Sequence, residues 1–242
     1  MTAIETNHVT KTYGDKKVVN DVSFTIQKGE VFSILGVNGA GKSTLIKMLS
    51  CLVKLTSGKA FIFGYDVMKE AAQVKKLIAV SPQETAIAPN LTVYENLELM
   101  AGAHGFSKKD RERKLKEVMG TFLLIPFEKQ RSKTLSGGWK RRLSIAMALI
   151  SEPDILFLDE PTLGLDILAR RELWKVIKGL KGRVTIILTT HYLEEAESLS
   201  DRICILKRGE VKALGTAKEL IAQTSAQSFE DAFIDLVGEG SI

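Results

Sequence analysis

The sequence predicts an α/β fold, in which parallel strands joined by helices form a core sheet and an α-helical subdomain is inserted into it. Three short apolar runs, Val31–Leu35, Ile155–Leu158 and Val184–Leu188, are typical of strands buried on both faces. Between Leu91 and Ile150 the patterns are helical instead. Strands joined by helices indicate a largely parallel sheet, and the helical stretch in the middle indicates an insertion into it.

The first third of the chain alternates between strand and helix patterns. Val22, Phe24 and Ile26 alternate with polar residues, which predicts a strand with one buried face. A glycine-rich stretch follows the apolar run, and Lys42–Val53 is then predicted to form a helix. Its apolar residues fall on one face: Leu45, Ile46, Met48, Leu49 and Leu52.

Three helices are predicted in the middle of the chain. Asn90–Glu95 begins the first, Ser107–Asp110 begins the second, and Lys140–Ile150 forms the third. The second helix carries charges of both signs along Lys108–Lys114, which predicts a solvent-exposed face.

The C-terminal tail is predicted to be helical beyond Leu214 and to dock on the core. Phe229, Phe233, Leu236 and Val237 would share one apolar face. The predicted organisation is a main domain at residues 1–222 and a tail at 223–242. Within the main domain, the core comprises 1–87 and 152–215, and the helical subdomain comprises 88–151.

Composition excludes several classes of protein. The 242 residues carry a net charge of +5 and are 45% hydrophobic, which supports a globular core and excludes disorder. The longest run without a charged residue, Val31–Gly41, is far shorter than the ~20 residues that a bilayer span needs. The N-terminus lacks a signal-peptide pattern, so a cytosolic protein is expected. The small positive charge does not indicate a nucleic-acid partner. Cys51 and Cys204 lack metal-binding spacing and are expected to be buried.

Gly36–Ser43 is the strongest functional signal. It fits the pattern G-x-x-x-x-G-K-[ST], directly after a predicted strand and before a predicted helix. Glycines let backbone N–H groups converge on phosphate oxygens, and the helix adds its positive N-terminal end. Lys42 would bring a charge to the outer phosphates, and Ser43 would offer a hydroxyl to Mg²⁺, which prefers oxygen ligands. The pattern predicts a nucleoside triphosphate site.

Two carboxylates follow the second buried strand. Asp159 ends that strand, which places it at the carboxyl edge of the sheet, where ligands bind in open α/β folds. Glu160 comes next. Asp159 would hold Mg²⁺, directly or through water, and Glu160 would orient or deprotonate the attacking water.

A second glycine-rich segment is predicted to receive phosphate. Ser136-Gly137-Gly138 precedes a helical run, and a helix start with a hydroxyl and exposed N–H groups suits an anion. By itself the segment is equally compatible with an ordinary helix cap. Beside the first phosphate loop it suggests that two copies of the chain share each nucleotide.

In this order along the chain, these motifs resemble those of the ATP-binding cassette (ABC) ATPases. GVNGAGKST resembles the Walker A motif, ILFLDE the Walker B motif, and LSGGW the family signature. Gln83 resembles the glutamine of the Q-loop, and Leu163–Asp166 resembles the D-loop. His191 is similar to the switch histidine, and Tyr13 to the aromatic residue that stacks on adenine.

The resemblance implies a P-loop NTPase fold of the α/β class, with a RecA-like mixed-sheet core, an inserted α-helical subdomain and an antiparallel β region at the N-terminus. It implies ATP and Mg²⁺ as cofactors. It implies that Lys42, Glu160 and His191 are catalytic, and that Ser43, Gln83 and Asp159 hold the metal. The residues implied to contact ATP are Tyr13, Gly36, Val37, Asn38, Gly39, Ala40, Gly41, Lys42, Ser43, Thr44, Gln83, Ser136, Gly137, Gly138 and Asp166.

One residue departs from the family pattern. The fifth position of the signature is usually Gln, and here it is Trp139. The phosphate-binding part, Ser136-Gly137-Gly138, is intact, so nucleotide capture is expected to survive. Because Glu160 and His191 are both present, a non-hydrolysing nucleotide sensor is disfavoured.

The expected role is the ATP-hydrolysing subunit of a membrane transporter. The segments TTHYLEEAE, FGYDV and SFEDAFIDLVGEG resemble the ABC-2-type branch, which exports drugs, antibiotics and related compounds. The expected partners are a separate permease, which would hold the chain on the inner face of the cell membrane, and a second cassette in a head-to-tail homodimer. A soluble ABC ATPase of translation or DNA repair, and a subunit of an ion exporter or an importer, remain as alternatives.

Overall fold

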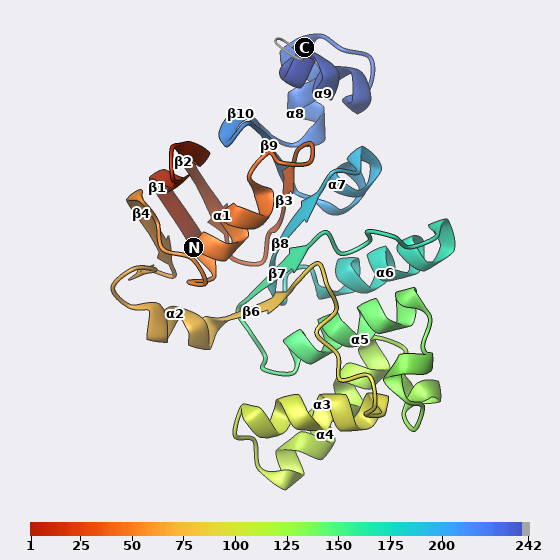
Figure 1. The fold of residues 1–242 in the computed structure, drawn as a ribbon. Helices are drawn as coiled ribbons and strands as arrows, with labels where there is room; N and C mark the ends of the chain where they lie inside the picture. The colour runs from red at the N-terminus through yellow and green to blue at the C-terminus, as the bar shows by residue number, and fades with distance from the viewer. Residues whose placement is uncertain (239–242) are drawn as a thin grey trace.

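The computed structural model describes residues 1–238 and confirms the α/β class and the N-terminal antiparallel region. A four-stranded antiparallel sheet has the order β2-β1-β4-β5, and a six-stranded sheet has the order β10-β9-β3-β8-β7-β6 (Figure 1). The first sheet comprises β1 (Thr2–Tyr13), β2 (Lys16–Gln27), β4 (Ser57–Ile62) and β5 (Tyr65–Asp66). The second comprises β3 (Val31–Leu35), β6 (Ile78–Ser81), β7 (Ile155–Asp159), β8 (Thr185–Thr190), β9 (Arg202–Lys207) and β10 (Glu210–Gly215).

The six-stranded sheet is parallel except at one edge. Strands β6, β7, β8, β3 and β9 run in one direction, and only β10 pairs in the antiparallel sense, with β9. Every residue of β3, β7 and β8 is buried, as their apolar sequences predict. Because these strands are parallel, the loops that follow Leu35, Asp159 and Thr190 emerge at the same edge of the sheet.

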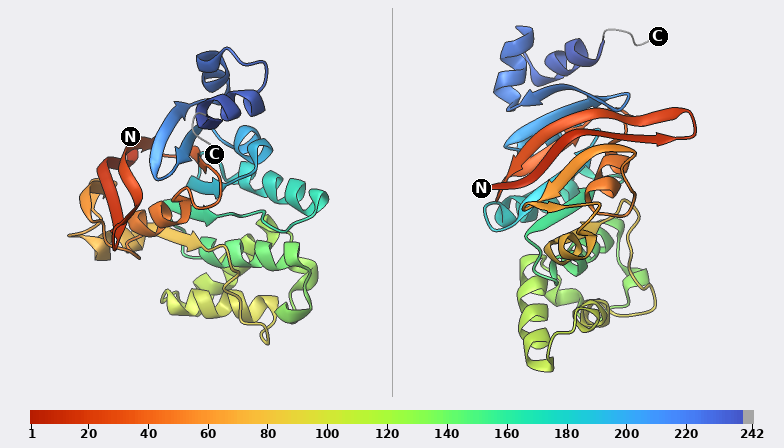
Figure 2. Two further views of the ribbon diagram at one scale, coloured as in Figure 1. Left: turned by 45° about the horizontal axis from the view of Figure 1, so that its top comes forward. Right: turned by 90° about the vertical axis from the view of Figure 1, so that its left-hand side faces the viewer.

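Alternate residues of these strands pack into two hydrophobic clusters on opposite faces of the sheet. Phe32 and Phe157 pack on one face with the antiparallel sheet and with helix α1 (Lys42–Leu49). Leu156 and Leu188 pack on the other with helices α5 (Gly137–Leu149) and α6 (Ile167–Leu180). Helix α2 (Ala71–Leu77) leads into β6. The core sheet therefore lies between a layer that contains α1 and the antiparallel sheet and a helical layer, as Figure 1 and the left view of Figure 2 show.

The middle of the chain is helical, as predicted. Helix α3 (Val93–Ala103) begins with a capping box between Thr92 and Glu95, and α4 (Lys108–Thr121) begins at the cap Ser107. Two short 3₁₀ turns, η1 (Ile125–Phe127) and η2 (Ser132–Thr134), lead into α5. Helix α5 begins at Gly137, three residues earlier than the sequence predicts. Ser136 is its N-cap residue, and Gly137 and Gly138 form part of its first turn.

The C-terminal part docks on the β9–β10 side, as expected. Helices α7 (Leu193–Leu199), α8 (Ala217–Thr224) and α9 (Phe229–Gly238) share a cluster that buries Phe229 and Val237. Phe233 and Leu236 pack against the same cluster. Helix α8 begins at Ala217, within the stretch beyond Leu214 that was predicted to be helical, and the boundary between residues 222 and 223 stays a prediction. No helix within residues 1–238 is long and apolar enough to cross a membrane.

Helix α1 is shorter than the sequence predicts. It ends at Leu49 rather than Val53, and Leu52, which was expected on its buried face, is 63% exposed. The N–H groups of Leu52 and Val53 both bond to the carbonyl of Lys47, and Cys51 has a left-handed φ of 58°. The chain therefore turns back sharply after the helix. Cys204 is buried as expected, whereas Cys51 is only partly buried.

Lys114 does not belong to the exposed face predicted for α4. Its side chain is buried, forms an ion pair with Glu152, and lies over the ring of Phe106 with Nζ 4.1 Å from the centroid. The methylene stem packs on the aromatic ring while the charge is neutralised, which explains why a lysine is tolerated there.

Candidate functional site

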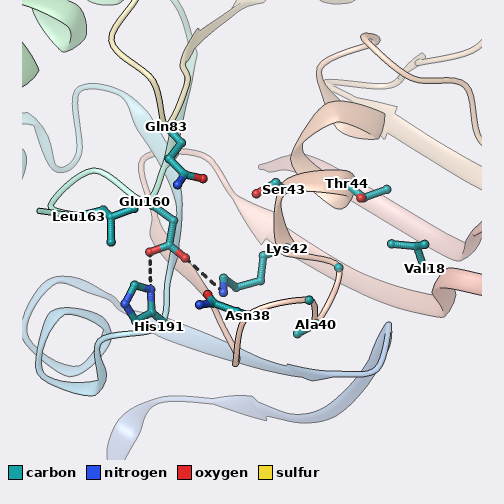
Figure 3. Close-up of a pocket in the computed structure, with 12 residues that line it drawn as sticks. Val18, Asn38, Ala40, Lys42, Ser43, Thr44, Gln83, Glu160, Leu163 and His191 are labelled. Atoms are coloured by element: carbon teal, nitrogen blue, oxygen red, sulfur yellow. Dashed lines mark hydrogen bonds and ion pairs between the residues drawn. The ribbon is translucent and has the colours of Figure 1, made fainter.

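A pocket of about 450 Å³ lies where the loops after β3, β6, β7 and β8 meet (Figure 3). It brings together residues from five separate parts of the sequence. These are Val18, Asn38, Gly39, Ala40, Gly41, Lys42, Ser43, Thr44, Gln83, Glu160, Leu163 and His191. Most of the residues predicted to form the phosphate and metal site therefore line one cavity.

The glycine-rich loop, Gly36–Ser43, joins β3 to α1. A Cβ atom at Gly36 would lie 2.3 Å from the carbonyl oxygen of Leu206, so no other residue fits there without a shift of the backbone. Gly41 has a left-handed φ of 104°, and its Cβ would lie 2.5 Å from the carbonyl oxygen of Val18. The loop is held against β9 and β2 by these close approaches, and the N–H of Gly209 donates to the carbonyl of Ala40 at 2.9 Å.

Lys42 is the first residue of α1, and its ammonium is buried within the loop. Its Nζ donates to the carbonyl oxygens of Gly36 and Val37 at 2.7 and 3.3 Å. It also forms an ion pair with Glu160, with 3.1 Å between Nζ and Oε1. The cation is thus held at the pocket by three acceptors, two of which belong to the loop itself.

Asp159 lies at the end of β7, beneath the start of α1. The hydroxyl of Ser43 donates to Oδ1 of Asp159 at 2.9 Å, and the hydroxyl of Thr189 on β8 donates to the same oxygen at 2.6 Å. The backbone N–H of Glu160 donates to the Thr189 hydroxyl at 3.0 Å. These bonds bring together side-chain oxygen atoms from β7, β8 and α1, and oxygen atoms are the ligands that Mg²⁺ prefers.

Glu160 points into the pocket from a strained backbone. Its φ of 48° is left-handed, a conformation that costs free energy for a residue with a Cβ atom and is found preferentially at functional sites. Its carboxylate contacts Lys42 through one oxygen and accepts a bond from Nδ1 of His191 through the other, at 2.8 Å (Figure 3). His191 follows β8 by one residue. The carboxylate is therefore fixed on both sides, with one edge towards the cavity.

Arg141, on α5, supports this site from behind. Its guanidinium is buried and donates to main-chain oxygens of the loops that carry Glu160 and Gln83. Burial lowers the pKa of Arg141 to about 10, and the nearby carboxylates of Asp159, Glu195 and Glu160 oppose this shift. The guanidinium remains charged at neutral pH.

Several predicted site residues are not part of the pocket lining. Gly36, Val37 and Asp159 adjoin lining residues in the sequence, whereas Tyr13, Ser136, Gly137, Gly138 and Asp166 come from other segments. Tyr13, at the end of β1, is half exposed, with Nζ of Lys11 at 4.8 Å from its ring centroid. Ser136 and Gly137, at the start of α5, are exposed. Gly138 lies against Ala169, and a Cβ atom added to Gly138 would lie 3.1 Å from the Cβ atom of Ala169. Their contact with a nucleotide stays a prediction.

Asp166 has a local role that the sequence did not reveal. Its carboxylate accepts a bond from the N–H of Ala169 at 2.8 Å and so caps α6. It is exposed and lies outside the pocket lining. A contact between Asp166 and ATP stays a prediction.

Sequence reasoning missed Thr189, Arg141 and Glu195. Thr189 offered a weak signal, since two threonines, Thr189 and Thr190, end an otherwise apolar run just before His191. Arg141 lies in a basic run, Lys140–Arg142, that resembles any solvated helix. Glu195 lies among exposed acidic residues in the sequence, but its carboxylate is buried and accepts a bond from the indole of Trp174 at 3.1 Å.

The sequence model described as "ABC transporter" matches residues 19–163 of the chain. The doxorubicin resistance ATP-binding protein DrrA of Mycobacterium tuberculosis is 43% identical over 221 residues, which are 90% of this chain and 67% of that protein. The linearmycin resistance ATP-binding protein LnrL of Bacillus subtilis is 39% identical over 240 residues, 96% of this chain and 77% of the relative. The Nod factor export ATP-binding protein I of Rhizobium etli is 44% identical, covering 91% and 70%.

Solved structures agree with these relatives. An ATP-binding subunit of an ABC transporter superposes with a TM-score of 0.85 at 32% identity, covering 97% of this chain and 99% of that one. A dimeric ATP-binding cassette in a post-hydrolysis state, bound to ADP and Pi, superposes with a TM-score of 0.79 at 30% identity, covering 88% and 98%.

Proposed function

Because this chain belongs to the ABC transporter family, as an ATP-binding subunit that hydrolyses ATP, we propose that it drives export of drugs, antibiotics or related compounds through a separate permease. The observation that carries the hydrolytic part is one pocket that joins the glycine-rich loop, Lys42, Glu160 and His191. The export part is supported by the resistance and export functions in the names of the relatives.

The loop and its neighbours fit a magnesium nucleotide. The close approaches at Gly36 and Gly41 hold the backbone in its cradle shape, and at Gly39 the space around a Cβ position is open. The backbone N–H groups and Lys42 would hold the phosphates. Ser43, Gln83 and Asp159 offer a hydroxyl, an amide oxygen and a carboxylate, the oxygen donors that suit Mg²⁺. The metal would supply charge neutralisation on the phosphates.

Glu160 and His191 would act on the attacking water. Glu160 presents a carboxylate at the cavity, where it orients the water and accepts its proton. His191 donates to the same carboxylate at 2.8 Å and so holds it in place. Lys42 would stabilise negative charge on the terminal phosphate as the bond breaks. Tyr13 would stack on the adenine, as the family resemblance implies.

A second copy of the chain would complete each nucleotide site. Ser136 and Gly137 form an exposed helix start outside the pocket lining. They are therefore accessible to a nucleotide that is bound in the pocket of a second copy. Beside them, the exposed side chains of Ile167 and Leu168 begin α6, at 67% and 76% exposure. An apolar patch next to a phosphate-binding helix start supports a head-to-tail dimer closed by nucleotide.

The permease would dock near Gln83 and the helical segment 88–151, and would hold the chain on the inner face of the membrane. We propose that this segment is a subdomain inserted between the two parts of the core, 1–87 and 152–215. The relatives' names describe resistance and export proteins, so a soluble role in translation or DNA repair is not favoured.

Phosphate release and vesicle transport test the proposal. The purified chain should release phosphate from ATP only when Mg²⁺ is present. Inverted membrane vesicles that contain the chain and its permease should accumulate doxorubicin when ATP is added, and vesicles without the chain should not. Phosphate release without transport of any resistance-type compound would contradict the export role and leave the ATPase role standing.

A further inference from the structure

The guanidinium of Arg141 uses all five of its N–H donors on main-chain oxygens. Nε donates to the carbonyl of Pro161 at 2.8 Å, and Nη2 donates to those of Asp159 and Glu160 at 2.6 and 2.7 Å. Nη1 donates to the carbonyls of Pro82 and Gln83. Since an arginine has five such donors in a rigid planar fork, the hydrogen-bonding capacity of this side chain is fully used.

The five acceptors belong to two loops that carry pocket residues. One loop follows β7 and carries Glu160, and the other follows β6 and carries Gln83. The arginine itself lies in the second turn of α5, the helix that begins at Gly137. One side chain therefore joins the Glu160 loop, the Gln83 loop and the exposed helix start.

The backbone of Glu160 needs this support. Its left-handed φ of 48° is a strained conformation for a residue with a Cβ atom, and it persists only when surrounding contacts impose it. Nη2 of Arg141 donates to the carbonyl oxygens of Asp159 and Glu160, the two peptide oxygens on either side of the Glu160 Cα atom. A lysine has three donors on a single nitrogen and cannot reach carbonyls spread over two loops in this way.

We propose that Arg141 is a positioning residue for ATP hydrolysis. It fixes the positions of Glu160 and Gln83 relative to α5, the helix that begins beside Ser136. When a second copy binds at the start of α5, the position of this helix therefore determines the positions of both side chains. The proposal rests on the proposed ATPase function and adds a residue that does not itself contact the nucleotide.

Two variants and a neighbouring control test the proposal. Arg141→Gln and Arg141→Lys should bind ATP with a Kd within about threefold of the unmodified chain, because the glycine-rich loop and Lys42 are untouched. The kcat of Arg141→Gln should fall by about 10²-fold, the cost of a small misplacement of reacting groups. Arg141→Lys should recover part of the loss, since it keeps the charge and some of the bonds.

Arg142→Gln is the matched control. Arg142 is the next residue of α5, is also buried, and places its guanidinium 4.5 Å from the ring of Trp139 rather than on either loop. Its removal deletes the same charge from the same helix, and kcat should stay within about threefold of the unmodified chain. Equal losses of kcat in Arg141→Gln and Arg142→Gln would overturn the proposal, because charge or helix stability would then explain the effect.

The remaining outcomes are also decisive. An Arg141→Gln variant that hydrolyses ATP at the unmodified rate overturns the positioning role and leaves the ATPase function standing. Failure of both Arg141 variants to fold overturns it too, since the residue is then structural. An unmodified chain that binds and hydrolyses no ATP refutes the proposed function, and the role of Arg141 with it.

Discussion

The ammonium of Lys42 and the carboxylate of Glu160 form a buried ion pair, with 3.1 Å between Nζ and Oε1 and less than a tenth of either side chain exposed. Leaving either charge buried without a partner costs several kcal/mol. A phosphate group that binds Lys42 must therefore compete with Glu160 for the same ammonium. The pair links capture of the nucleotide to release of the carboxylate that we propose acts on water.

Replacing Lys42 tests the phosphate site. Lys42→Ala should raise the Kd for ATP by about 10- to 100-fold, the worth of a hydrogen bond to a charged group, and should abolish turnover. Lys47→Ala changes an exposed lysine on the same helix and should leave both unchanged. Equilibrium binding and phosphate release measure the two effects, and circular dichroism checks the fold. Unchanged turnover in Lys42→Ala would reject the site.

Replacing Glu160 separates binding from hydrolysis. Glu160→Gln should lower kcat by about 10²- to 10⁴-fold, the range for loss of a general base. It should bind ATP at least as tightly, because Lys42 no longer pairs with a carboxylate. With hydrolysis blocked, a dimer should accumulate in ATP and not in ADP, as seen by size-exclusion chromatography. A monomer at saturating ATP would contradict the shared nucleotide site.

Trp139 is expected to stabilise the fold rather than bind nucleotide. The centroid of its ring lies 4.3 Å from the ring centroid of Phe127 and 4.5 Å from Cζ of Arg142, and both partners belong to the same chain. Trp139→Gln should lower the free energy of unfolding by about 1–3 kcal/mol through lost packing. Trp139→Phe should recover part of it. ATP affinity should stay unchanged, and a large loss of affinity would show a direct role at the site.

Glu195 predicts a pH dependence of stability. Burial raises the pKa of this carboxyl above 4.5, and the hydrogen bond that the Trp174 indole donates to it opposes the shift. Well below pH 4.5 it is protonated in both states. As the pH rises, the unfolded chain ionises first and binds fewer protons, so the carboxyl lowers stability until the pH passes its folded value.

Glu195→Gln removes this penalty and keeps an acceptor for the Trp174 indole. Relative to the unmodified chain, the variant should therefore be more stable at pH 8 than at pH 4.5. Urea unfolding at both pH values measures the difference. A stability difference that is independent of pH would contradict the raised pKa.

The sequence predicted those parts of the fold that depend on local pattern. The runs Val31–Leu35 and Ile155–Asp159 are strands, and the motif that contains Lys42 lies between a strand and a helix, because apolar periodicity and glycine spacing are visible in one short window. The end of α1 was predicted too late, since the left-handed turn at Cys51 depends on contacts outside that window.

The site was predictable as far as motifs extend. Asp159, Glu160 and His191 follow buried strands, and parallel strands bring their ends together. Arg141 was not predictable, because its acceptors are backbone atoms up to 59 residues away, and a helical run of basic residues carries no sign of burial. Glu195 was missed for the same reason, since the bond to Trp174 spans 21 residues.

Every bond that Arg141 donates ends on a backbone carbonyl, and mutation of the residue that carries the carbonyl leaves that oxygen in the chain. No second-site substitution can therefore compensate for losing the arginine by supplying a new matched side chain. In a comparison of many relatives, the position should show little exchange and no correlated partner, although it touches five other residues. Methods that infer proximity from paired substitutions would overlook this contact network.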